Sequence, residues 1–169
     1  MELRSIGPFI EYFEKVRERT MRVVECIPAD KLEHSFGVGR FTLGDLARHL
    51  AIVERYTWAE CVQGKPHRYP GCGREWADGL ENVIALMQRL HRESMEVFSR
   101  FTPDDLAGKC LSPGGSPITR WKALRLILEH EIHHRGEIYA YLGMLGVKTP
   151  PLYGMTSEQL LTAAAAESS

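Results

Sequence analysis

The stretch from residue 118 to residue 146, ITRWKALRLILEHEIHHRGEIYAYLGMLG, decides the fold. Ile127, His130, His134 and Ile138 recur at spacings of three and four residues, which places them on one face of a helix. A glycine ends the pattern and two prolines follow it, as is typical of a helix C-terminus. The stretch therefore predicts a long helix whose mostly apolar face packs inside a helical protein.

Three stretches that precede this helix show the same periodicity. Apolar stripes predict helices at about residues 8–27, 42–62 and 76–101, and glycines and prolines separate them. A capping-box pattern at Thr156 predicts a short fifth helix. Because no stretch alternates apolar and polar residues over a sustained length, we expect no strands. The sequence thus predicts an all-α protein, a four-helix bundle with a short extra C-terminal helix.

The composition is that of a globular domain without charge bias. The chain has 169 residues, of which 44% are hydrophobic and 25% are charged, and its formal net charge is −1. A balanced charge gives no electrostatic drive toward nucleic acid. The longest nearly apolar run, Ile138–Val147, is about half the length of a membrane span. We therefore expect no nucleic acid or membrane partner, and one domain over residues 1–169, with a core bundle at about 8–147 and an extension at 148–169.

Cysteine usage and the first residues indicate the compartment. Four cysteines are scattered without a CxxC pair, and the start of the sequence shows no apolar secretory segment. These features favour reduced thiols and a cytoplasmic location. Cys72 lies between two glycines in a loop, where we expect it to be exposed but not activated as a thiolate.

Three histidines lie where they would enter the bundle interior. His130 and His134 are one turn apart on the apolar face described above, and His49 lies on the apolar stripe of the second predicted helix. A buried imidazole without a partner is costly, and neutral imidazole is a common ligand of divalent metals. The pattern predicts a metal site with a position left open for water. The alternative is that the histidines are core residues bonded to carbonyls or carboxylates.

The same segment also has the form of a zinc peptidase motif. Residues 130–134 read HEIHH and match HExxH, in which Glu131 would be the general base. However, Glu137 stands where the longer peptidase motif has glycine, and Glu158 is the one downstream carboxylate at a plausible distance for a third ligand. Strands that would hold an extended peptide are not expected. A metal site inside a bundle is therefore the preferred interpretation.

Two segments carry a resemblance to a known family. They are TLGDLARHL at residues 42–50 and HEIHHRGEI at residues 130–138. In this order, with helical stretches around them, they resemble the DinB-like (YfiT-like) family of metalloenzymes over nearly the whole chain. The resemblance implies a four-helix bundle that holds a divalent metal, most often nickel or zinc, on His49, His130 and His134. Manganese and iron are further candidates.

The family resemblance also implies a kind of chemistry and an assembly. Members include cytoplasmic enzymes that use low-molecular-weight thiols such as bacillithiol or mycothiol on small-molecule substrates. Similar bundles often form a homodimer through their first and fourth helices, and we expect one here. The family pattern usually has glutamine where this chain has Glu137, a departure that can change the charge at the mouth of the site or the metal preference.

Two acidic residues are candidates for a role beside the histidines. Glu137 lies about 40° from the midline of the histidine pair on a helical wheel, so we name it as the candidate catalytic residue. The alternative is a boundary residue paired with an arginine. Asp45, one turn before His49, either holds the second ring nitrogen of that histidine or supplies a charge at the helix N-terminus.

Three neutral ligands leave the charge of a divalent ion uncompensated and leave coordination positions open. Water or a thiol bound there is activated as a nucleophile. The sequence therefore predicts a metal-dependent enzyme of the hydrolase or thiol S-transferase type. An alternative from another class is a non-catalytic metal-binding bundle, such as a stress protein, which a fourth protein ligand would favour. A third interpretation is a helical interaction module.

Overall fold

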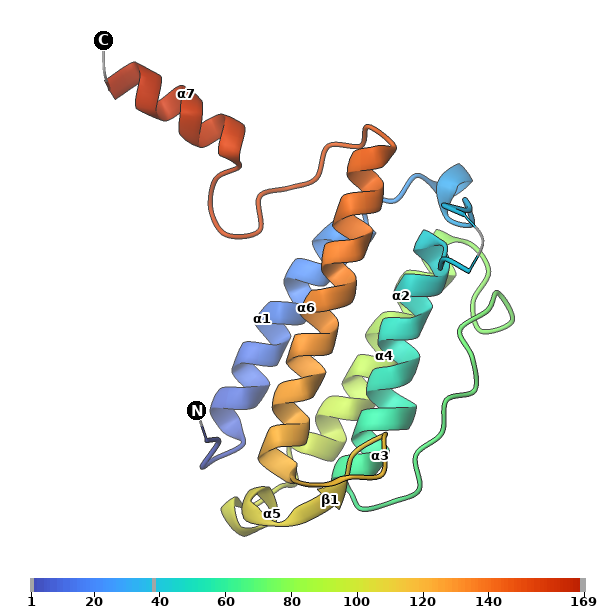
Figure 1. Cartoon of the computed structure of the whole chain (residues 1–169), viewed down its shortest axis with the longest axis vertical. Helices are drawn as coiled ribbons and strands as arrows, with labels where there is room; N and C mark the ends of the chain where they lie inside the picture. The colour runs from blue at the N-terminus through green and yellow to red at the C-terminus, as the bar shows by residue number, and fades with distance from the viewer. Residues whose placement is uncertain (1, 38, 168–169) are drawn as a thin grey trace.

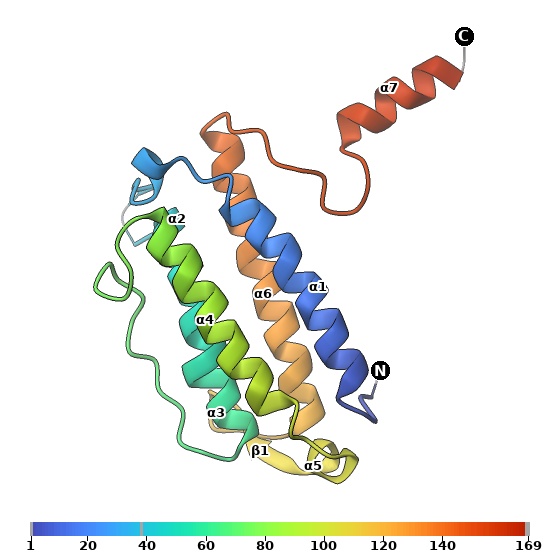
Figure 2. The ribbon, with the colours of Figure 1, turned by 180° about the vertical axis from the view of Figure 1, so that it is seen from behind.

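Four long helical segments form the body of the protein, and they lie side by side in both views of the computed structural model (Figures 1 and 2). The structure describes residues 2–37 and 39–167. The four segments are α1 (Gly7–Val24), α2 (Leu43–Ile52) with its continuation, α4 (Leu80–Phe98) and α6 (Arg120–Met144). Both α1 and α2 pack against α4 and against α6. This arrangement is the predicted all-α four-helix bundle. Among the described residues, no helix has both the length and the apolar character needed to cross a membrane.

The second predicted helix begins as expected but is not uniform. The Thr42 hydroxyl accepts a hydrogen bond from the Asp45 backbone N–H at 2.9 Å, and the Asp45 carboxylate accepts one from the Thr42 backbone N–H at 3.1 Å. This confirms the capping box. After Ile52 the backbone forms a π-helical segment, η2 (Val53–Trp58), before the short helix α3 (Ala59–Val62). A π-helical turn adds a residue to the helical turn and changes which side chains face inward. Here it places Glu54 in the interior.

The connection between the third and fourth long helices contains structure that the sequence analysis did not predict. It holds a short helix, α5 (Pro103–Ala107), and two strands, β1 (Lys109–Leu111) and β2 (Pro117–Thr119). The strands pair antiparallel, with Cys110 opposite Ile118. The expectation of no strands is therefore wrong at this point, because three-residue strands are too short to show an alternating pattern.

The C-terminal helix α7 (Ser157–Glu167) projects away from the bundle (Figures 1 and 2). It begins with the predicted capping box, in which the Gln159 side chain accepts from the Thr156 backbone N–H at 2.8 Å. The segment before it is tied to the bundle, because Arg135 Nη2 donates to the Tyr153 hydroxyl at 2.7 Å. The division into a bundle at 8–147 and an extension at 148–169 stays a prediction, and residues 168–169 lie outside the described part of the chain.

A layer of buried polar side chains crosses the bundle interior. Arg17 on α1, Glu54 on η2, His91 on α4 and Glu131 on α6 are each at most 6% exposed. On each of these four helical segments, the buried polar residue lies at the boundary between two apolar clusters. One cluster includes Val24, Leu50, Leu90 and Ile138, and the other includes Phe13, Val53, Met95 and Ile127. We call these four residues the polar layer.

Hydrogen bonds and ion pairs join the polar layer. Arg17 Nη2 donates to Glu54 Oε2 and, at 2.8 Å, to Glu131 Oε2. His91 Nδ1 lies 3.0 Å from Glu54 Oε1. Burial by itself raises the pKa of Glu54, but the charges of Arg17 and His91 outweigh it and hold the pKa below its usual value. Arg17 therefore pairs with both buried carboxylates, and His91 gives Glu54 a second partner.

Candidate metal centre

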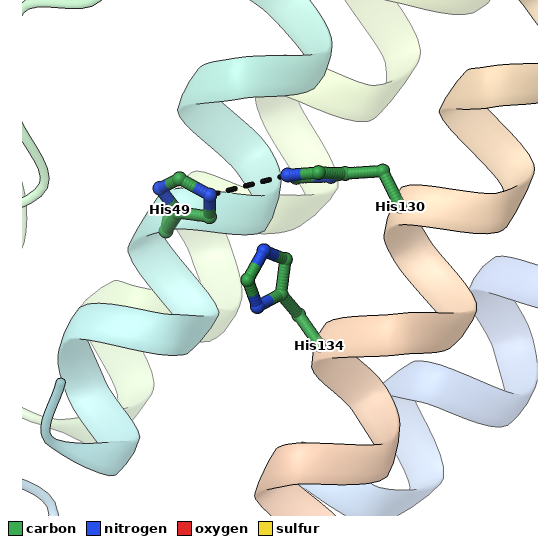
Figure 3. A group of neighbouring side chains, drawn as sticks. All are labelled: His49, His130 and His134. Atoms are coloured by element: carbon green, nitrogen blue, oxygen red, sulfur yellow. Dashed lines mark hydrogen bonds between the residues drawn. The ribbon is translucent and has the colours of Figure 1, made fainter. Parts of the chain in front are cut away.

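Three histidines from two helices converge on one point between α2 and α6 (Figure 3). His49 Nε2 and His130 Nε2 are 3.2 Å apart. The ring centroid of His134 lies 4.7 Å from that of His49 and 4.5 Å from that of His130. Each imidazole offers a nitrogen that lies within 4.8 Å of the other two. The helix geometry fixes the pair on α6, and the packing of α2 against α6 brings in the third ring.

The spacing of the nitrogens fits a divalent ion. Two nitrogens at about 2.0–2.1 Å from a tetrahedral zinc lie about 3.3 Å from each other. The separation of 3.2 Å between His49 and His130 is close to that value. Imidazole suits zinc, nickel, copper and iron better than it suits magnesium or calcium. The donor set therefore fits a transition metal with room for a further ligand.

The electrostatic surroundings keep two of these rings neutral. Burial, with a further contribution from repulsion by His134, lowers the pKa of His49 to about 4. Burial, followed by repulsion from His134, His49 and His133, lowers the pKa of His130 to about 3. At neutral pH both rings are uncharged and each has one nitrogen with a free lone pair, which is the form that binds metal.

Neighbouring side chains orient two of the rings toward the cluster. Glu137 Oε2 lies 2.5 Å from His134 Nδ1, so this nitrogen carries the proton and Nε2 keeps its lone pair. The Tyr69 hydroxyl lies 2.9 Å from His49 Nδ1 and donates its own proton to Cys72 Sγ at 3.2 Å. With the tyrosine proton directed at Cys72, His49 Nδ1 donates to Tyr69, and this tautomer again leaves Nε2 free. Such partners fix the tautomer of metal-binding histidines in proteins.

Tyr69 was not identified from the sequence, and the expectation that Cys72 is exposed was wrong, whereas burial raises the pKa of its thiol, in agreement with a cysteine that is not activated. Cys72 is only 7% exposed. Tyr69 and Cys72 belong to the loop between α3 and α4. The fully buried Arg48 binds this loop: its Nε donates to the Cys72 carbonyl at 2.7 Å, and its Nη1 donates to the Ala77 carbonyl at 3.1 Å. Arg48 directly precedes His49 on α2. The same helical turn therefore carries the candidate metal ligand and the arginine that binds the loop of Tyr69. These are long-range contacts, and no local sequence pattern reports them.

Two acidic residues considered from the sequence lie elsewhere. Asp45 caps α2 and pairs with Arg48 Nη2 at 2.9 Å, which matches the helix N-terminus interpretation rather than a bond to His49. Glu131 points into the polar layer, where it pairs with Arg17. A carboxylate that is buried and bonded there does not act as the base of an HExxH site, so the zinc peptidase interpretation is wrong.

A second group of possible ligands overlaps the first. His133, His134 and Glu137 also offer donor atoms close to one another. However, the His133 side chain is 68% exposed, and the contact between His134 and Glu137 already uses Nδ1 of the shared ring. The three-histidine group is more buried and has its rings preoriented. We therefore take His49, His130 and His134 as the candidate metal centre, with Glu137 as a positioning residue beside it.

Replacement of Glu137 by glutamine should lower metal affinity about tenfold, within the 10–100-fold range that loss of such partners usually costs. The amide oxygen of glutamine still accepts the proton of His134 Nδ1, but it lacks the negative charge that strengthens this bond. Competition with a chromophoric chelator measures the change. Glu129→Gln is the control, because Glu129 lies on the same helix and pairs with Arg125 at 3.3 Å. Equal affinity of Glu137→Gln and the unmodified protein would show that Glu137 plays no positioning role.

Comparison with known proteins agrees with this architecture. A DinB-like protein from Bacillus cereus is 19% identical and superposes with a TM-score of 0.74, over 89% of this chain and 99% of its own. YfiT from Bacillus subtilis, described as a probable metal-dependent hydrolase with an unusual four-helix bundle topology, is 19% identical, with a TM-score of 0.68 over 85% of this chain and 89% of its own. At such identities the likeness shows a shared fold.

A more distant likeness extends to a mycothiol-dependent maleylpyruvate isomerase. It is 14% identical, with a TM-score of 0.57 over 80% of this chain and 63% of its own. No curated protein matches the sequence. A family model of the DinB superfamily, in contrast, matches residues 12–138. This match covers most of the bundle and includes all three histidines, and it confirms the resemblance drawn from the sequence: the chain belongs to the DinB superfamily.

Proposed function

We propose that this protein is a divalent-metal-dependent enzyme whose ion is held by His49, His130 and His134. The observation that carries the proposal is the convergence of three imidazole nitrogens from two helices within 4.8 Å of one another. Two of these rings are neutral at physiological pH and two have their second nitrogen engaged by a neighbour. Nickel and zinc are the proposed metals, with manganese and iron as further candidates.

Three protein ligands favour a catalytic site over a closed structural one. A structural zinc site usually has four protein ligands, whereas a catalytic site leaves a position for water or substrate. Glu137, the residue best placed to be a fourth ligand, is bonded to the far nitrogen of His134 instead. An ion bound to three neutral ligands lowers the pKa of a water or thiol in its open position. The site is therefore suited to activation of a nucleophile.

Two types of reaction use such a nucleophile, and we propose that the enzyme catalyses one of them. Hydrolysis uses water, and YfiT is described as a probable metal-dependent hydrolase. Transfer or addition of a low-molecular-weight thiol uses sulfur, and a protein of similar fold is a mycothiol-dependent isomerase. The substrate in either case is a small molecule. The homodimer and the cytoplasmic location expected from the sequence remain predictions.

The test combines metal analysis with an activity screen. Protein purified without a histidine tag should contain close to one transition metal ion per chain. Nickel-, zinc- and manganese-loaded protein is then assayed against simple esters and amides, and against electrophiles with mycothiol, bacillithiol or glutathione. We expect turnover that requires metal and is lost in His49→Ala. Protein that binds no metal and is equally stable with and without metal salts would overturn the proposal. Bound metal without turnover would favour the non-catalytic alternative.

A further inference from the structure

Two exposed aromatic rings contact the imidazole of a candidate metal ligand. The Phe41 ring centroid lies 5.3 Å from that of His49, and the Tyr69 ring centroid lies 5.4 Å from it. Phe41 is 38% exposed and Tyr69 is 48% exposed. Single exposed apolar residues are common and need no explanation. Two exposed aromatic rings that both contact the same candidate metal ligand, His49, do need an explanation.

The exposed aromatic side chains of the molecule are few, which makes this pairing informative. Within residues 2–37 and 39–167, Phe41 is the one exposed phenylalanine. The exposed aromatic residues in that part of the chain are Tyr12, Phe41, Tyr69, Tyr139 and Tyr153. Two of these five therefore lie against His49. Aromatic side chains beside a candidate metal centre are one feature of small-molecule sites.

The fold positions the backbone of Phe41 and the hydroxyl of Tyr69 before any substrate binds. Phe41 directly precedes Thr42, the residue whose capping box begins α2. Tyr69 is fixed by its hydroxyl, which bonds to His49 Nδ1 and to Cys72 Sγ. The loop that carries it is anchored by Arg48. A ligand that stacks on these rings therefore loses little free energy to ordering of the protein.

The charge of the surroundings indicates what kind of group fits. Phe41 has no titratable group, and a tyrosine hydroxyl is ordinarily neutral at physiological pH. A neutral aromatic surface favours flat, apolar groups, which pack on it edge-to-face or offset.

We propose that Phe41 and Tyr69 form an aromatic wall that selects substrates carrying an aromatic or flat apolar group next to the bond that reacts at the metal. This inference rests on the proposed function, because it assumes a metal with an open position beside His49. It adds a substrate class, which neither the family nor the three histidines specify. In this arrangement Tyr69 has two separable roles: its hydroxyl orients His49, and its ring contacts the bound substrate.

Binding of two simple metal chelators tests the wall without any knowledge of the substrate. Acetohydroxamate and benzohydroxamate present the same metal-binding group with and without a phenyl ring. Calorimetric titration of each into the zinc- or nickel-loaded full-length protein gives their affinity ratio. We expect benzohydroxamate to bind about tenfold more tightly, as two aromatic contacts supply. Comparison of the ratio between variants cancels any intrinsic difference between the two chelators.

Variants separate the ring contacts from other effects. Phe41→Leu retains an apolar side chain of similar size and should lower the tenfold preference to about threefold, because one of the two aromatic contacts remains, while acetohydroxamate binds as before. Tyr69→Phe should keep the preference, because the ring remains, but should weaken metal binding, because the bond to His49 is lost. Tyr12→Ala changes an exposed tyrosine on α1 and should leave both affinities unchanged. Thermal melting checks that each variant is folded.

The outcomes distinguish failure of this inference from failure of the proposed function. If both hydroxamates bind and their affinity ratio is the same in Phe41→Leu as in the unmodified protein, the aromatic wall is wrong and the open metal site stands. If neither hydroxamate binds to protein that demonstrably holds metal, no open position exists, and the proposed function is overturned together with the wall. A ratio that falls in Phe41→Leu but not in Tyr12→Ala supports the inference.

Discussion

Replacement of Arg17 by methionine is expected to lower the free energy of unfolding by about 3–5 kcal/mol. Arg17 is the cation that pairs with both Glu54 and Glu131, and all three side chains are at most 5% exposed. Methionine fills a similar volume but leaves Glu131 in the interior without its cation and Glu54 with His91 as its remaining partner. For a chain of this length the loss corresponds to a fall in Tm of about 10 °C. Urea denaturation followed by circular dichroism measures it.

Two further variants test the cause of this loss. Arg74→Met removes an arginine that pairs with Asp78 at 2.9 Å on the surface, where both side chains are more than 60% exposed. Such an exposed pair contributes at most about 0.5 kcal/mol, so this variant should be nearly as stable as the parent. Adding Glu131→Gln to Arg17→Met should recover part of the stability, because it removes one uncompensated charge. A loss below about 1 kcal/mol in Arg17→Met would contradict the assigned role of the polar layer.

Replacement of His130 by alanine is expected to reduce metal affinity by more than about 100-fold. Loss of a partner that merely orients a ligand costs 10–100-fold, and loss of a ligand itself should cost more. The effect on stability follows from mass action. Metal at about 1,000 times its dissociation constant stabilises the native state by about 4 kcal/mol, which raises Tm by about 10 °C. We expect this rise in the unmodified protein and at most about a third of it in His130→Ala.

His133→Ala is the matched control, because His133 lies on the same helix but is 68% exposed. It should retain both the affinity and the rise in Tm. The comparison also separates the two overlapping groups of donors, since His134 belongs to both. If His133→Ala loses the metal and His130→Ala keeps it, the ion binds to the outer group with Glu137, and the assignment of His49 and His130 as ligands is wrong.

Much of the fold and part of the site follow from local sequence. The periodicity of α6 places His130 and His134 on one face, because residues four apart in a helix always lie one turn apart. The inward orientation of His49 likewise follows from the apolar stripe of α2. The capping boxes at Thr42 and Thr156 were also predicted correctly, because they depend on residues only three positions apart.

The sequence by itself determined that this chain forms a helical bundle with three inward histidines, since helix period, capping and apolar stripes are properties of neighbouring residues. Only the tertiary structure decided that His49 meets His130, which lies 81 residues further along the chain, at a distance of 3.2 Å. It also decided that Glu131 faces Arg17 rather than the metal centre, and that Tyr69 orients His49. These contacts depend on how whole helices and loops pack against one another, and that packing is set by the entire core rather than by any short stretch of sequence.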